Sequence, residues 1–175
     1  PETPRTWSLF EFDDGYTAAL THVIPWTFHD RSETTLEQVY LSGMVEADTG
    51  EEVDAVLPLA RAWLRPPAVH TSGAASVPVR FDRAQRAYVL PRPARDDIVL
   101  RFDASVDSPL VRPAVVVTGW GDGPVAVLVD GEPARPGDRV RIGYEEHDGA
   151  TDLVLWFDLE ATEPTRLTIG APRAH

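Results

Sequence analysis

The chain has 175 residues, of which 43% are hydrophobic and 25% charged, with a formal net charge of −12 at pH 7 and no cysteine. No apolar run approaches the roughly 20 residues that span a bilayer, and nucleic-acid binding needs clustered positive charge, so neither a membrane nor a nucleic acid is an expected partner. The lack of cysteine excludes disulfides, thiolate nucleophiles and cysteine-based metal sites.

The length suits one domain with a single hydrophobic core. The chain begins PETPRTW and ends GAPRAH, and such flanks are typical of linker edges. We therefore expect residues 1–175 to form one β-sandwich domain that is cut from, or attached to, a larger chain.

The first half of the chain carries one hairpin signal and one ambiguous segment. The apolar stretches WSLFEF and YTAALTHVIPWTFH flank Asp13-Asp14-Gly15, which predicts a hairpin. Residues 51–64, EEVDAVLPLARAWL, have helix-like apolar spacing, but Pro58 in the middle lacks the N–H that a helix needs. The sequence therefore predicts two short extended pieces or one broken turn over 51–64.

The second half reads as a series of strands. DIVLRFD places Ile98, Leu100 and Phe102 on one face, while RPAVVVT and PVAVLVD are apolar on both faces, as central strands often are. DRVRIGYEE and TDLVLWFDLE alternate with a period of two around Asp148-Gly149, which predicts a hairpin, and TRLTI is a further strand. With turn signals every 8–12 residues, the whole indicates an all-β, antiparallel, jelly-roll-like sandwich of about ten strands with little helix.

Motifs for metal binding are weak. The five histidines, at positions 22, 29, 70, 147 and 175, lack the spacing of a ligand pair, and His22 shares a face with apolar residues, which favours a core position. The acidic turns EFDDG and EADTGEE offer oxygen ligands for calcium, but turns without a fixed ligand spacing are usually only solvated. We expect no metal ion and no cofactor.

Motifs for catalysis are equally weak. No G-x-S-x-G elbow is present, and carboxylate pairs carry no information in a chain with 28 acidic residues. Tyr16, His29 and Arg31 could converge as a lyase site, although polar residues at the end of a hairpin are the favoured interpretation. We therefore assign no catalytic residue, and the sequence favours a protein that is not an enzyme.

Two tryptophans are the candidate binding residues. Trp156 falls on the face of its strand opposite Leu155 and Phe157, among carboxylates, which suits a ligand platform or a contact to another domain. Trp120 stands between two glycines in GWGDG, which we expect to be a hairpin connection, and with Asp122 it resembles half of a carbohydrate site. The favoured alternative for Trp120 is a side chain that folds back to cap an open end of the sandwich.

Residues 112–170 resemble the terminal β-sandwich domains of large secreted bacterial polysaccharide-degrading enzymes, through GW, VDG, RIG and LVLWFDLEATEP in that order. The resemblance implies a non-catalytic module that binds a glycan through Trp120, Asp122 and Trp156 or packs against a neighbouring catalytic domain. It also implies an extracellular or periplasmic location.

A second resemblance runs through WSLFEFDDG, SGMVEADTGEEV and WLRPPAVHTSGAASVPVRF, which are similar to the lipocalin-like half-barrels of carotenoid hydratases and related cyclases. It implies an enzyme or carrier that encloses a hydrophobic small molecule. The two interpretations differ in geometry, because the module needs outward tryptophans whereas the lipocalin-like protein needs inward aromatics around a cavity.

Overall fold

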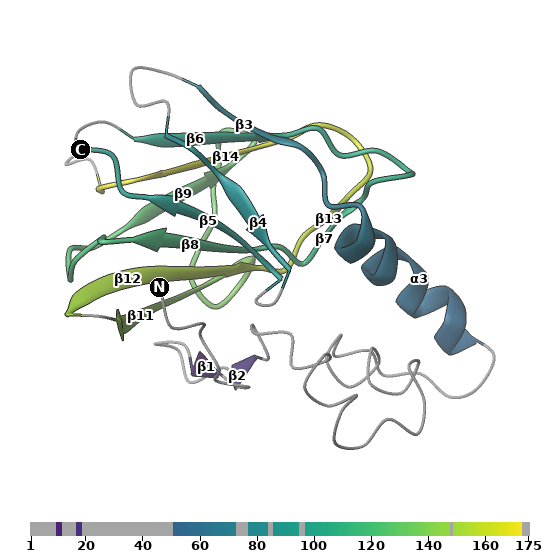
Figure 1. Cartoon of the computed structure of the whole chain (residues 1–175), viewed down its shortest axis with the longest axis horizontal. Helices are drawn as coiled ribbons and strands as arrows, with labels where there is room; N and C mark the ends of the chain where they lie inside the picture. The colour runs from purple at the N-terminus through teal and green to yellow at the C-terminus, as the bar shows by residue number, and fades with distance from the viewer. Residues whose placement is uncertain are drawn as a thin grey trace.

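Two five-stranded β-sheets packed face to face form the body of the protein (Figure 1). The computed structural model describes residues 10–11, 17–18, 51–72, 77–83, 86–94, 97–147 and 149–172. Within these residues the fold is the expected all-β sandwich, with ten strands in its two main sheets and little helix.

The first sheet, here called the β14 sheet, has the strand order β10-β9-β14-β6-β3. Its strands are β3 (Val69–Ser72), β6 (Ile98–Phe102), β9 (Ala126–Val129), β10 (Glu132–Pro133) and β14 (Thr165–Gly170). The β9–β10 hairpin turns at Asp130 and Gly131, whose φ angles of 51° and 89° are both positive, as in a two-residue type I′ turn. All four pairings in this sheet are antiparallel.

The second sheet, here called the β12 sheet, has the order β11-β12-β8-β5-β4. Its strands are β4 (Arg80–Asp82), β5 (Ala87–Pro91), β8 (Ala114–Thr118), β11 (Val140–His147) and β12 (Ala150–Phe157). The expected hairpin around residues 148 and 149 is confirmed, since β11 and β12 pair from Val140↔Phe157 to His147↔Ala150. Two short pairs lie outside these sheets, β7 (Leu110–Val111) with β13 (Glu160–Ala161) and β1 (Phe10–Glu11) with β2 (Thr17–Ala18).

One strand pair departs from the antiparallel prediction, because β5 and β8 run parallel. After β5 the chain crosses to the β14 sheet as β6, and it returns through β7 to the β12 sheet as β8. Because β6 runs the opposite way, β8 re-enters beside β5 in the same direction, and no tight hairpin joins the two.

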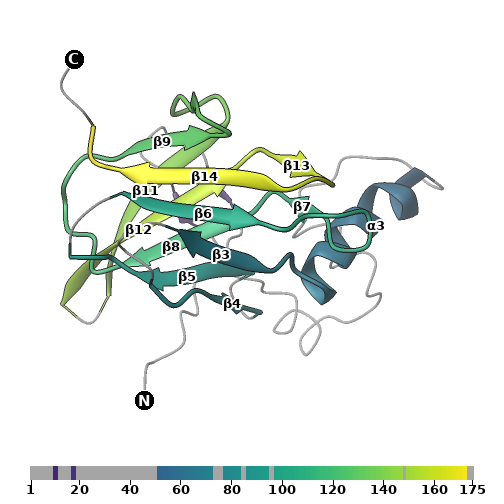
Figure 2. The same ribbon diagram turned by 90° about the horizontal axis from the view of Figure 1, so that it is seen from above.

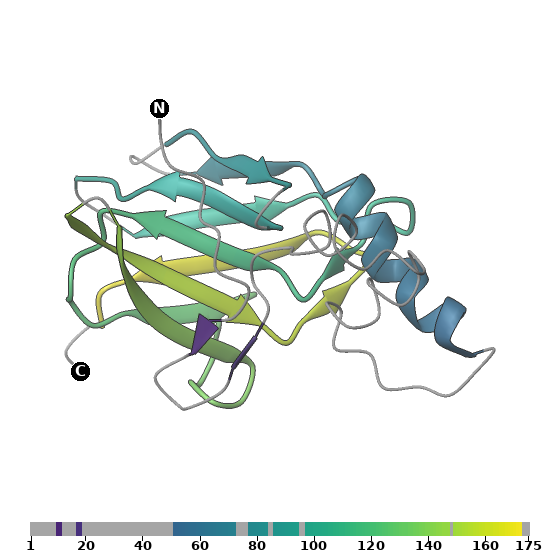
Figure 3. The ribbon, with the colours of Figure 1, turned by 60° about the horizontal axis from the view of Figure 1, so that its bottom comes forward.

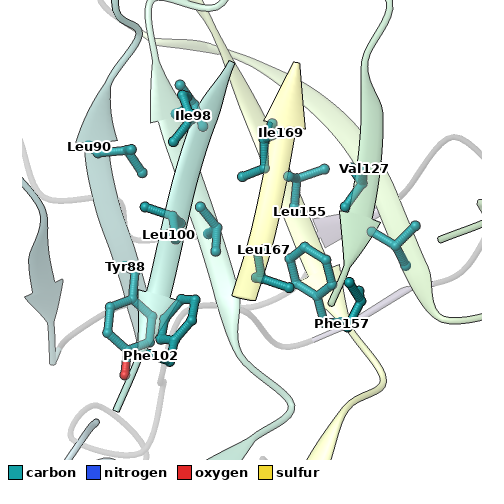
Figure 4. Packing of buried hydrophobic residues seen from close by; sticks show 14 of the residues in the cluster. Tyr88, Leu90, Ile98, Leu100, Phe102, Val127, Leu155, Phe157, Leu167 and Ile169 are labelled. Carbon is teal, nitrogen blue, oxygen red and sulfur yellow. The ribbon is translucent and has the colours of Figure 1, made fainter. Parts of the chain in front are cut away.

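The core fills the space between the two sheets with the inward side chains of both (Figure 4). As predicted, Ile98, Leu100 and Phe102 point inward and are buried. Tyr88 packs edge-on against Phe102 at 4.9 Å between ring centroids, and its hydroxyl donates a hydrogen bond of 3.1 Å to the carbonyl of Pro67. Burial raises the pKa of Tyr88 well above its usual range, so the phenol stays neutral and remains a donor.

The prediction for residues 51–64 is wrong, because this segment is one continuous helix, α3 (Glu51–Leu64), with Pro58 inside it. Pro58 removes a single backbone hydrogen bond, and tertiary contacts outweigh that loss. Leu59 of the helix is buried, and the helix contacts β7. Two contacts with Arg83 fix its end: Trp63 Nε1 donates to the Arg83 carbonyl at 3.3 Å, and the Arg83 guanidinium donates to the Leu64 carbonyl at 3.2 Å.

The outer face of the β12 sheet is also covered. Val116, Val154 and Trp156 lie outside the core between the sheets, yet all three are buried by other parts of this chain. The β1–β2 pair lies on this side of the β12 sheet, away from the β14 sheet (Figures 1 and 3), and its pairing of Phe10 with Ala18 agrees with the predicted N-terminal hairpin. The β12 sheet is therefore an inner layer, whereas the β14 sheet presents its outer face to solvent.

Replacing Pro58 with alanine should raise the free energy of unfolding by about 1–3 kcal/mol, because alanine restores the missing donor within α3. Urea denaturation followed by circular dichroism would measure the change. Arg61→Ala, at an exposed position one turn later, is the control and should shift stability by less than about 0.5 kcal/mol. A loss of stability in Pro58→Ala would mean that the proline is required for the path of the helix.

Candidate functional site

The GWGDG segment is not a hairpin connection, because it joins β8 in the β12 sheet to β9 in the β14 sheet. The link must therefore cross the gap between two packed sheets, which is about 10 Å. Gly119 and Gly121 have φ angles of 68° and 81°, in the left-handed region where glycine is favoured. These two glycines turn the chain across the end of the sandwich and direct the side chain between them inward.

Trp120 consequently closes the end of the core. It is only 4% exposed and belongs to the cluster of buried residues between the sheets. Its indole Nε1 donates to the carbonyl of Gly123 at 2.9 Å, and the Tyr144 hydroxyl from β11 donates to the same carbonyl at 3.0 Å. The favoured interpretation of Trp120 as a cap is thus correct, and the expectation of an outward platform is wrong.

Arg92 covers the outer side of this cap. Its guanidinium carbon lies 4.4 Å from the centroid of the Trp120 ring, which is a cation–π contact, and the guanidinium also donates to the Trp120 carbonyl. The backbone N–H of Arg92 donates to the carbonyl of Thr118 at 2.9 Å. The arginine that follows β5 therefore binds the chain at Thr118, just before the turn, and at Trp120 within it.

Two bonds from β12 hold the turn from the other side. The N–H of Gly119 donates to the Asp152 carboxylate at 2.8 Å, and the N–H of Gly121 donates to the carbonyl of Thr151 at 2.9 Å. Asp152 is a buried carboxylate, and its hydrogen bond compensates for part of the free-energy cost of burying it. Asp152 lies on the same face of β12 as Trp156, and its bond to Gly119 gives it a structural role that the sequence did not indicate.

The other predicted site residues do not join Trp120 in one site. Asp122 is exposed at the tip of the turn. Trp156 is 7% exposed, on the outer face of the β12 sheet, where it lies between Arg141 of β11 and Ala114 of β8. Thr151, which contacts the Trp120 turn, is near the start of β12, whereas Trp156 is near the end of that strand. The two tryptophans are therefore separated by most of the length of β12. Trp156 points away from the core between the sheets, as expected, but it is buried within this chain. The expectation that its face is left open for a ligand or another domain is therefore wrong, and β12 is covered on both faces.

Two hollows that sequence reasoning missed lie beside this turn. The smaller, of about 450 Å³, is lined by Arg92, Trp120 and Asp97 among others. The larger, of about 1040 Å³, is here called the β9–β14 groove and runs over those two strands and the segment that follows β10. Asp97, Gly170 and Ala171 line both hollows, so the two adjoin. A Cβ added to Gly170 would overlap the Asp97 carboxylate, and only glycine allows this close approach.

The groove combines an apolar floor with polar margins. Val99, Leu128 and Pro133 contribute apolar surface, and Thr168 lies between Val99 and Leu128 in the strand register. The margins carry both signs of charge, with carboxylates from Asp97 and Asp130 and guanidiniums from Arg135 and Arg166. Sequence patterns could have marked the outward positions of β9 and β14, but not the hollow that they share with the chain after β10.

A half-buried arginine at the opposite end, near α3, is structural. Burial, and secondarily the charge of Arg112, lowers the pKa of Arg86 to about 10, so the group stays protonated at neutral pH. Arg86 donates to the Arg112 carbonyl at 3.3 Å, and Arg112 lies 3.5 Å from the Glu160 carboxylate. These contacts connect β5, the β7–β8 link and β13.

No group of three or more histidine and acidic side chains is arranged to hold a metal ion in the described part of the chain. None of the helices described there is long and apolar enough to cross a membrane. His22, the Tyr16, His29 and Arg31 trio and most of both acidic turns lie outside the described residues.

Trp120→Ala should lower the free energy of unfolding by about 3–5 kcal/mol, because it empties the end of the core and removes the ring that Arg92 covers. Asp122→Ala, two residues away and exposed, is the matched control and should change stability by less than about 0.5 kcal/mol. Urea denaturation measures both. Equal, small effects of the two substitutions would contradict the capping role.

Trp156→Ala should cost a similar 3–5 kcal/mol, roughly, since both faces of β12 are covered. Trp156→Phe should cost clearly less, because a phenyl ring fills much of the same space. Thermal and urea unfolding of the two variants would measure the difference. If Trp156→Ala left stability within about 0.5 kcal/mol, as exposed substitutions do, the outer face of the β12 sheet would be open in solution.

Comparison of the chain with protein-family models, with curated proteins and with solved structures gives no match. The function therefore has to be inferred from the sandwich, its capped end and the β9–β14 groove.

Proposed function

We propose that the protein is a non-catalytic carbohydrate-binding module of a bacterial glycan-active protein that works outside the cytoplasm, and that a glycan lies in the β9–β14 groove. The observation that carries this proposal is the groove itself, a hollow of about 1040 Å³ open to solvent on the β14 sheet. Its volume is slightly above the roughly 300–1,000 Å³ typical of ligand sites.

The chemistry of the groove suits a sugar. Sugar rings present C–H faces that pack on apolar surface, and Leu128, Val99 and Pro133 supply such surface. The hydroxyl groups of a sugar both donate and accept hydrogen bonds. At the margin of the groove the Asp130 carboxylate can accept such bonds and the Arg166 guanidinium can donate them. A hollow with both features can orient a ring as well as hold it.

The groove is also built on rigid backbone. Thr168 pairs with Leu128 on one side and with Val99 on the other, so three hydrogen-bonded strands fix the floor. Asp130 reinforces this frame, because its carboxylate accepts from the Arg166 N–H at 2.8 Å while its own N–H donates to the Arg166 carbonyl at 2.8 Å. A site that is ordered before binding loses little conformational entropy when a ligand arrives.

The other roles have less support. Packing against a catalytic domain favours a contiguous exposed apolar patch, but among the described residues only Leu64 and Val106 are large, apolar and well exposed. A lipocalin-like carrier needs an apolar cavity inside a barrel. The described strands instead form two open sheets, with core side chains between them. Binding on the outer face of the β14 sheet therefore remains the proposal.

Affinity gel electrophoresis against a panel of soluble polysaccharides, followed by calorimetry, tests this function. At least one polysaccharide should retard the protein, and Leu128→Asn should weaken its binding about tenfold, which corresponds to about 1.4 kcal/mol. Val106→Asn is the matched control, because Val106 is exposed and does not line the groove. Failure of every polysaccharide to bind, or equal loss in both variants, would reject the proposal.

A further inference from the structure

A row of basic side chains crosses the outer face of the β14 sheet. His70 of β3 pairs in register with Arg101 of β6, and Arg101 pairs in register with Arg166 of β14. Figure 2 looks onto this face and shows β3, β6 and β14 side by side. All three residues are exposed, and cross-strand partners in a sheet lie on the same face.

The row is unfavourable for the free protein. Like charges directly opposite each other on neighbouring strands destabilise a sheet, and here two guanidiniums face the same way. The only carboxylate that the described residues place within ion-pair distance of the row is Asp103, 3.0 Å from His70 Nε2 and 3.5 Å from the Arg101 guanidinium. In the described part of the chain Arg166 has no ion-pair partner, although the whole chain has a net charge of −12.

The row is continuous with the groove. Arg166 lines the β9–β14 groove, and Arg101 and His70 follow it across the next two strands. Neighbouring strands are about 4.8 Å apart, so the row extends about 10 Å from the groove margin toward the edge of the sheet. A ligand that fills the groove and carries acidic groups at regular intervals would meet these side chains in succession.

We propose, on the basis of the glycan-binding function above, that the ligand is a polyuronate, a polysaccharide with a carboxylate on each sugar ring. The guanidiniums of Arg101 and Arg166 would bind successive carboxylates in the bidentate geometry that arginine favours. The rings themselves would pack on the apolar floor of the groove beside Leu128 and Val99.

The charge balance favours carboxylates over sulfates. Within the row, two arginines stand against the single carboxylate of Asp103. At the groove margin Arg135 stands against Asp97 and Asp130, so the face offers separate guanidiniums and no large positive excess. A densely sulfated polymer needs a larger basic cluster to overcome repulsion from a protein of net charge −12. A polyuronate, by contrast, carries one charge on each ring, which suits single guanidiniums that lie one strand spacing apart.

The test compares polygalacturonate with the same polymer after methyl esterification, which removes the charge and keeps the backbone, and alginate serves as a second polyuronate. Dextran and dextran sulfate form a neutral and a sulfated pair. Affinity electrophoresis should show retardation by a polyuronate, little by the esterified polymer, and weakening as sodium chloride is raised. The double variant Arg101→Gln/Arg166→Gln should bind the polyuronate at least tenfold more weakly.

Arg80→Gln is the matched control, because Arg80 is a strand arginine of the other sheet with a similarly exposed side chain near a carboxylate. Circular dichroism and urea unfolding would confirm that the variants are folded. Equal binding of esterified and free polymer, unchanged binding by the double variant, or preference for dextran sulfate would overturn the polyuronate assignment while leaving a glycan module intact. Absence of binding to every polysaccharide would overturn the module itself.

Discussion

The contact between Trp120 and the open end of the sandwich is the constraint on which the rest of the structure depends. Two stacked sheets leave their core open at each end, and the connection that crosses this end carries the side chain that closes it. Arg92, which follows β5, covers the Trp120 ring, whereas Tyr144 from β11 and Asp152 from β12 bind the backbone of the turn around it. The turn therefore joins three parts of the β12 sheet to the link that leads into the β14 sheet.

This arrangement separates structural surfaces from the surface available for binding. The β12 sheet is covered on both faces, and Trp156, which the sequence pattern suggested as a ligand platform, is one of its buried side chains. The outer face of the β14 sheet carries the β9–β14 groove, so its outward side chains at Leu128, Thr168 and Arg166 can meet a ligand. The link through the capped end leads into β9, which pairs with β14, and the groove lies on these two strands.

Local patterns predicted the strands well, because a half-buried strand must alternate its side chains whatever it packs against. Leu155 and Phe157 point into the core, and Trp156 points away from it, as a period of two requires. The same reasoning failed at Pro58, where propensity alone argued against a helix. Contacts of the last turn of α3, including the bonds with Arg83, exist only in the folded chain and outweigh one missing hydrogen bond.

The sequence by itself determined the all-β class, the β11–β12 hairpin and the inward positions of β6, because each depends on neighbours close along the chain. Only the tertiary structure decided that β8 and β9 belong to different sheets, and hence that Trp120 points inward as a cap. The β9–β14 groove and the pairing of Arg101 with Arg166 were also beyond local patterns. Sites of this kind join residues distant in the sequence, and their positions are set by strand order and register, which residue periodicity does not encode.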